Sequence, residues 1–76
     1  MTSDIPFRDV PFQVQNYFDK GPSDQRVLRA KVRPVKLRQQ IVGDEYIVVT
    51  NYGTAYFRQD HWGDWKIHKT NIEVSK

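Results

Sequence analysis

The segment from Glu45 to Gln59, EYIVVTNYGTAYFRQ, decides the fold of this 76-residue chain. Valine, isoleucine, threonine and aromatic residues fill both of its halves, and these residue types favour strands. The Asn-Tyr-Gly sequence between the halves supplies turn residues. The segment therefore predicts a β-hairpin.

The register of this hairpin follows from where its apolar side chains fall. A two-residue loop at Tyr52-Gly53 would mix charge into the apolar face, because it places Ile47 opposite Arg58. A three-residue loop at Asn51-Tyr52-Gly53, with Gly53 in the left-handed conformation, avoids this. The apolar face then consists of Ile47, Val49, Ala55 and Phe57, and the other face of Tyr46, Val48, Thr50, Thr54, Tyr56 and Arg58. We therefore expect the three-residue loop.

The segment after the hairpin predicts a further strand beginning at Trp65. A short connection at residues 60–64 leads to it, and Trp65 and Ile67 are expected to point to the core while Lys66 and His68 point away. Further on, Ile72 and Val74 suggest a final short strand.

Residues 25–33 fit two secondary structures. As a strand, the segment places Leu28, Ala30 and Val32 on one face and Arg29, Lys31 and Arg33 on the other. As a helix, it would be capped by Ser23 and built from residues of good helix propensity. The strict period of two favours the strand. Pro34 interrupts either structure, so we expect a bulge or a turn to a second short strand there.

A helix is predicted near the N-terminus, from about Val10 to Asp19. Its apolar residues recur at three- and four-residue spacing, Asp9 is placed as the N-cap, and Pro11 is tolerated in the first turn. Gly21 and Pro22 end it. The stripe consists of Phe7, Val10, Pro11, Val14, Tyr17 and Phe18, and Phe12 points away from it.

The fold class expected from these elements is α+β. A chain of 76 residues forms one domain, and the absence of cysteine leaves apolar burial to stabilise it. The N-terminal amphipathic helix at 10–19 would pack on a small antiparallel sheet of four to five strands within residues 25–74. The short strands also suit a bent SH3-like barrel.

The positive charge of the chain is concentrated in residues 26–38. These thirteen residues, RVLRAKVRPVKLR, contain six cations and no acid. Residues 1–25 sum to −2 and residues 39–76 to −1, so this basic stretch accounts for the whole net charge of +3. A local cationic stretch is a candidate contact surface for a polyanion.

Nucleic-acid binding without catalysis is the function these features favour, and it would be weak and independent of base sequence. Cations neutralise phosphates, and exposed aromatic rings stack on bases. The expected residues are Arg26, Arg29, Lys31, Arg33, Lys36, Arg38, Tyr46, Tyr56 and Arg58. The same pattern also describes the solvated face of any half-buried sheet.

The alternative function is a protein-interaction module or a homodimer that uses the same aromatic and arginine residues. Trp62 in the sequence DHWGDW is its candidate anchor, because tryptophan is frequent among interface hot spots. A ring folded back over the end of the core is the structural alternative for Trp62.

Other function classes receive little support from the sequence. His61 and His68 lack the spacing of zinc ligands, so no metal or other cofactor is expected. The chain has no cysteine nucleophile, no glycine-rich phosphate loop and no carboxyl pair in an apolar setting, so no enzyme is expected either. No apolar run approaches a membrane span and no signal peptide is visible, so a cytoplasmic protein is the default expectation.

Overall fold

The computed structural model describes residues 2–72. Strand β1 (Ser3–Ile5) is followed by a 3₁₀ turn (Phe7–Asp9) and helix α1 (Phe12–Asp19). Four strands follow: β2 (Val27–Leu37), β3 (Gln40–Thr50), β4 (Gly53–Gln59) and β5 (Trp65–Thr70).

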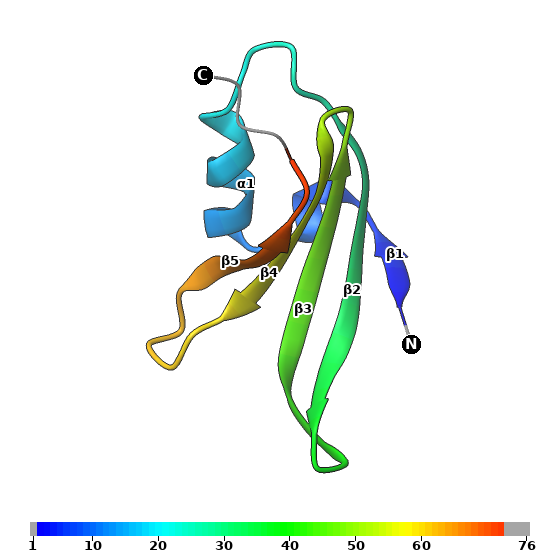
Figure 1. The fold of residues 1–76 in the computed structure, drawn as a ribbon, viewed down its shortest axis with the longest axis vertical. Coiled ribbons are helices and arrows are strands. Elements are labelled where there is room, and N and C mark those ends of the chain that lie inside the picture. The colour runs from blue at the N-terminus through cyan, green and yellow to red at the C-terminus, as the bar shows by residue number, and fades with distance from the viewer. Residues whose placement is uncertain (1, 73–76) are drawn as a thin grey trace.

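The strands form one antiparallel sheet in the order β1-β2-β3-β4-β5, which is also their order in the sequence. Helix α1 packs against one face of this sheet (Figure 1). The predicted α+β class is therefore confirmed, with five strands in the described residues. Because the order runs from β1 to β5 without returning, the sheet is not closed, and the SH3-like barrel is not confirmed.

Helix α1 begins later than predicted. Asp9 is the last residue of the 3₁₀ turn, and the residue that precedes α1 is Pro11, which makes no side-chain capping hydrogen bond. Val10 has an extended backbone, with φ −75° and ψ 156°, because the ring of Pro11 disfavours the helical conformation for the residue before it, and the N–H of Val10 is bonded to the carbonyl of Phe7 (3.2 Å). The predicted N-cap at Asp9 is therefore wrong, and Val10 enters the core as part of the linker.

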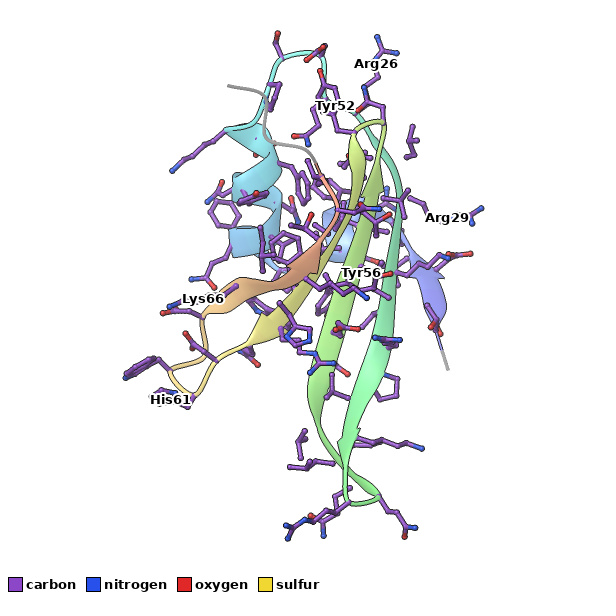
Figure 2. The ribbon with its side chains drawn as sticks, in the orientation of Figure 1. Arg26, Arg29, Tyr52, Tyr56, His61 and Lys66 are labelled. Atoms are coloured by element: carbon purple, nitrogen blue, oxygen red, sulfur yellow. The ribbon has the colours of Figure 1, made fainter. Side chains whose placement is uncertain are left out.

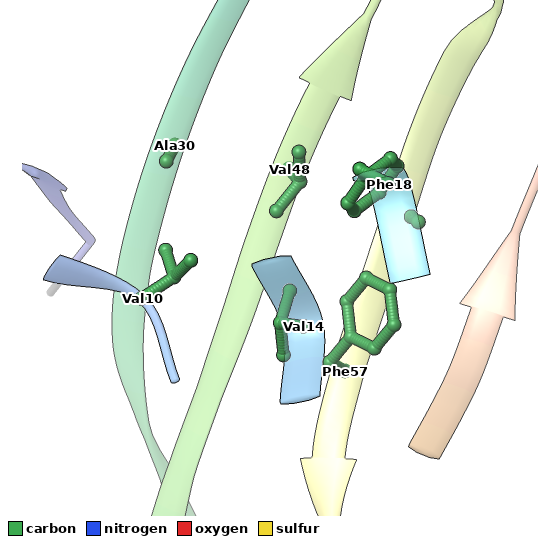
Figure 3. Close-up of a cluster of buried hydrophobic side chains, with 7 residues drawn as sticks. Val10, Val14, Phe18, Ala30, Val48 and Phe57 are labelled. Carbon is green, nitrogen blue, oxygen red and sulfur yellow. The ribbon is translucent and has the colours of Figure 1, made fainter. Parts of the chain in front are cut away.

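The core lies between α1 and the sheet. Val14 and Phe18 are buried on the helix, and Val48, Ala55 and Phe57 are buried on the sheet (Figure 3). The rings of Phe18 and Phe57 meet edge to face with centroids 5.7 Å apart, a favourable aromatic geometry. The predicted amphipathic stripe holds only for part of the helix, because Tyr17 remains 48% exposed.

Residues 27–37 form one continuous strand, so the strand alternative was correct and the helix alternative wrong. Ala30 is buried against the core, and the alternation places Arg29, Lys31 and Arg33 on the opposite face. Pro34 does not interrupt β2. The register instead shifts at two other places, between Val35 and Lys36 and between Val27 and Arg29. Leu28 lies at the second of these shifts and is 65% exposed, so its predicted place beside Ala30 on the apolar face is wrong.

The β3–β4 hairpin has a register that the sequence did not predict. Thr50 pairs with Gly53, so the loop consists of the two residues Asn51 and Tyr52. The Thr50 hydroxyl donates to the Gly53 carbonyl (2.9 Å) and accepts from the Tyr52 N–H (3.1 Å), which holds this tight loop. Gly53 does have a positive φ, 143°, but as the first residue of β4.

In this register the side chains of β3 lie on the opposite faces of the sheet from those predicted. Val48, rather than Ile47 or Val49, faces α1, and Ile47 and Val49 pair with Tyr56 and Thr54 on the other face. The prediction assumed one apolar face for the sheet. It failed because β3 is the central strand and carries apolar side chains on both faces.

Strand β5 matches its prediction in part. Trp65 packs against the core, whereas Ile67 is 37% exposed. A register shift leaves His68 between the paired residues Ile67 and Lys69. Ile72 lies beyond the strand, and Val74 lies outside the described residues.

Candidate nucleic-acid interface

The face of the sheet opposite α1, called here the open face, gathers cations from three strands. Antiparallel partners point to the same face, so the register defines rows of neighbouring side chains that run across the strands. One row contains Lys31, Ile47, Tyr56 and Lys69, and the next contains Arg33, Glu45, Arg58 and Lys66. Figure 2 shows Tyr56 near the middle of the sheet, with Arg29 and Lys66 toward opposite margins.

Glu45 lies at the centre of the second row and is the most buried charged residue in the described chain. Its side chain is 1% exposed, although no helix covers this face. The Nε of Arg33 donates to its Oε1, and the Nε of Arg58 donates to its Oε2 at 2.8 Å. One carboxylate thus fixes two guanidinium groups that come from two different strands.

The electrostatics of this triad favour the ionised carboxylate. Burial acts to raise the pKa of Glu45, but the hydrogen bonds and charges of Arg58 and Arg33 outweigh it and lower the pKa below its ordinary value. The arginine side chains remain 45% and 38% exposed. Both arginine side chains are therefore partly open to solvent, while the acid between them is paired with both.

Tyr56 is the aromatic residue of the first row. The guanidinium carbon of Arg33 and the Nζ of Lys69 each lie 5.9 Å from its ring centroid. These distances are at the outer limit of a cation–π contact. The half-buried ring thus stands among cations, which is the arrangement predicted for phosphate contacts beside a stacking surface.

Two residues at the margin complete the charge of the open face. The Nε of Arg29 is 3.9 Å from Oδ1 of Asp4 on β1, and both side chains are mostly exposed, so this ion pair is weak. Lys66 is also paired, with its Nζ 3.4 Å from Oδ2 of Asp60. The cations of the face are Arg29, Lys31, Arg33, Arg58, Lys66 and Lys69, and the acids paired with them are Asp4, Glu45 and Asp60.

Tyr46 does not belong to this surface. It faces the core side, where its ring meets Trp65 edge to face with centroids 4.9 Å apart. Burial, aided by the charges of Asp44 and Asp9, raises the pKa of its hydroxyl above the ordinary value. The predicted base-stacking role of Tyr46 is therefore withdrawn, because the two-residue loop turns this side chain toward α1.

The remaining predicted cations are distributed along the length of β2. Arg26 precedes the strand at the end of the molecule that also carries the Asn51-Tyr52 loop (Figure 2), and its N–H donates to Oδ1 of Asn51 (2.7 Å). Lys36 and Arg38 lie at the opposite end, where β2 turns into β3. The cations of residues 26–38 are therefore spread along the length of the molecule and do not form one cluster.

A pocket of about 210 Å³ lies at the end of the second row. It is lined by Val35, Val42, Gly43, Asp44, Arg58 and Gln59. A Cβ built on Gly43 would have no heavy atom within 4 Å, so open space lies above this glycine. The pocket therefore extends the open face from Arg58 toward the apolar side chains of the β2–β3 end.

Trp62 lies in an ordered but exposed loop between β4 and β5. Oδ1 of Asp60 accepts hydrogen bonds from the N–H groups of Trp62 (3.0 Å) and Asp64 (2.9 Å). The Trp62 ring is 74% exposed and lies against His61 with centroids 3.6 Å apart. The alternative of a ring folded over the core is therefore wrong.

Sequence reasoning missed Glu45 and Lys69 as members of this surface. Glu45 could have been found from its opposite charge to Arg58, but only with the two-residue loop that pairs them. Lys69 could be placed on this face only with knowledge of the β5 register shift.

Within residues 2–72 no helix is long and apolar enough to cross a membrane. Comparisons with protein-family models, curated proteins and solved structures found no match to this chain.

Proposed function

We propose that the protein is a small nucleic-acid-binding protein whose open face contacts phosphates without catalysis and without strong base preference. The observation that carries this proposal is the pair of cross-strand rows, in which cations from β2, β4 and β5 share one uncovered face. In the second row Arg58 and Lys66 are one strand spacing apart and Arg33 and Arg58 are two apart, or about 5 and 10 Å, so these cations can contact phosphates of a strand laid across them.

The neutralised acid at the centre strengthens the proposal. A free carboxylate in the middle of the face would repel phosphates, but Glu45 is buried and bonded to both arginines. It holds the two guanidinium groups in place, which reduces the conformational entropy lost when they meet an anion. Tyr56 supplies one ring for stacking, so affinity is dominated by phosphate contacts.

The proposal is tested by a salt titration of binding to a fluorescently labelled mixed-sequence single strand, followed by anisotropy. If three to five cations meet phosphates, the logarithm of affinity should fall with the logarithm of salt concentration at a slope of about −2 to −3.5, roughly −0.7 per contact. Lys31→Glu should weaken binding and flatten the slope. Lys20→Glu is the matched control, because Lys20 is exposed at the end of α1, away from the open face.

Tyr56 is tested in the same assay by Tyr56→Ala, which should cost about 1–3 kcal/mol of binding and leave the slope nearly unchanged. Absence of binding by the wild-type protein at low ionic strength would reject the proposal, as would equal losses for the Lys31 and Lys20 variants.

A second candidate function, protein interaction, is favoured by a separate group of exposed aromatic residues. The side chain of Gln13 bonds to Asp64 Oδ1 (3.1 Å) and to the Trp65 N–H (2.9 Å), which ties the start of α1 to the β4–β5 loop. Phe12 and Trp62, 73% and 74% exposed, flank this connection. Sedimentation analysis tests the homodimer version: a dimer that Trp62→Ser abolishes supports it, and a monomer at high concentration rejects it.

A further inference from the structure

The end of the β2–β3 hairpin projects beyond the rest of the sheet. Strand β1 pairs only as far as Val32, and β4 pairs with β3 only from Glu45 onward, so in the described chain the strand residues within 34–44 pair only with each other. This segment, called here the β-arm, extends past the other strands in Figure 1. A two-stranded ribbon alone is only marginally stable in water. The packing of the domain therefore gives no reason for a ribbon that extends this far.

The β-arm exposes aliphatic side chains that the domain leaves uncovered. Leu37, Ile41 and Val42 are 62%, 66% and 59% exposed. Leu37 pairs with Gln40 and Ile41 pairs with Lys36, so these two side chains lie on opposite faces of the ribbon and cannot bury one another. Their exposure indicates a surface that is covered when a partner binds.

The turn of the β-arm has residue types that its backbone does not explain. Arg38 and Gln39 have φ values of 52° and 67°, as in a type I′ turn, where Asn-Gly is strongly preferred. Positive φ is unfavourable for side chains of this kind. Arg38 and Gln39 therefore occupy two positions at which asparagine and glycine would make the turn more stable. This indicates that their side chains serve a function other than stabilising the turn.

The chemistry of the β-arm matches an anionic partner with mixed polar and methyl groups. Within the β-arm, Lys36 and Arg38 supply positive charge, and its one acid, Asp44, lies at its base next to Glu45. Arginine pairs with guanine and glutamine with adenine in the major groove of DNA, and aliphatic side chains contact thymine methyls. That groove, about 12 Å wide, admits a two-stranded ribbon, whereas the major groove of A-form RNA does not.

We propose that the β-arm inserts into the major groove of double-stranded DNA. Arg38 and Gln39 at the turn and Gln40 on one face of the ribbon would face base edges, and Leu37, which shares that face as the partner of Gln40, would contact thymine methyls. The inference rests on the proposed function, because the open face would hold the adjacent phosphates. At about 3.3 Å per residue, Arg29 lies about 30 Å from Arg38 along β2, close to one turn of duplex. The β-arm therefore adds to the phosphate binding of the open face a contribution to affinity that duplex DNA receives and that single strands and duplex RNA do not.

The test uses the double variant Arg38→Asn, Gln39→Gly, which removes the base-reading side chains while supplying the preferred turn residues. It should melt at the same or a higher temperature than the wild-type protein, so loss of folding cannot explain a loss of binding. We expect about a 10-fold or greater loss of affinity for a mixed-sequence DNA duplex and a much smaller loss for a single strand. The control Lys20→Asn removes the same charge from the end of α1.

A second measurement isolates the methyl contacts. A duplex with deoxyuridine in place of thymidine lacks those methyl groups, and wild-type protein should bind it about fourfold more weakly for each contacted methyl. Leu37→Ser should reduce this difference. Unchanged duplex binding by the double variant, or equal binding of both duplexes by the wild-type protein, would overturn the groove proposal while leaving phosphate binding by the open face intact. Wild-type binding to anionic lipid vesicles and to no nucleic acid would overturn both.

Discussion

Replacement of Glu45 by glutamine tests the buried triad of the open face. Glutamine preserves the shape of the side chain but removes its charge, and its amide group presents a donor to one of the two arginine donors. Each charge-assisted hydrogen bond contributes about 1.5–3 kcal/mol to stability, compared with about 0.5–1.5 kcal/mol for a neutral bond. Loss of charge in both bonds therefore costs about 2 kcal/mol, and partial exposure of Arg33 and Arg58 limits the cost to about 1–2 kcal/mol.

This loss is measurable by urea denaturation. A slope of about 1–2 kcal/mol per molar converts it to a decrease of about 0.5–2 M in the unfolding midpoint. Asp44→Asn is the matched control, because it removes an acid from the adjacent but exposed position. We expect the midpoint of the control to change by much less than that of Glu45→Gln.

The pH dependence gives the same test an independent readout. Because the pKa of Glu45 is lowered from 4.5 in the folded protein, its ion pairs stabilise the fold above that pH, and the contribution is lost as pH falls through the folded-state pKa. The stability difference between wild type and Glu45→Gln should therefore shrink in acid. Equal stability of the two proteins at pH 7, or a difference that grows in acid, would refute the role assigned to the triad.

Three further substitutions test the fold. Phe18→Ala should lower the unfolding free energy by about 3–5 kcal/mol in urea denaturation, because the ring is 8% exposed and meets Phe57; an unchanged midpoint would contradict this packing. Gly53→Ala should lower the melting temperature, since its Cβ would lie 2.6 Å from Oδ1 of Asn71 at a φ of 143°; a neutral effect would show that the β4 start is not constrained. Gly43→Ala should raise stability by about 0.5–1 kcal/mol by the same denaturation assay, because its Cβ meets open space; clear destabilisation would indicate that the strand is packed differently there.

The sequence predicted those elements whose signals are local. The alternation from Arg29 to Arg33 depends only on the period of a strand, and it correctly placed three cations on the open face. The class of the fold and the identity of Phe57 as a core residue followed from the same kind of pattern.

The errors arose where contacts between segments distant in the sequence determine which face of the sheet a side chain occupies. Val48 and Ile47 are equally apolar, so the pattern could not show which one faces α1 once the central strand has apolar residues on both faces. The same ambiguity hid Glu45, which is buried only because Arg33 and Arg58 reach it from neighbouring strands. The start of α1 was missed because Pro11 keeps Val10 in an extended conformation, so the helix begins only after the proline.

The central claim, that the open face binds nucleic acid, is tested most directly by mapping amide chemical shifts during titration with an unlabelled oligonucleotide at low ionic strength. Shifts should concentrate on the open-face rows, at Lys31, Ile47, Tyr56 and Lys69, while Val14 and Phe18 of α1 change little. They should reverse as salt is added, because phosphate contacts are screened. A spectrum that does not change, or shifts confined to α1 and the Trp62 loop, would contradict the claim.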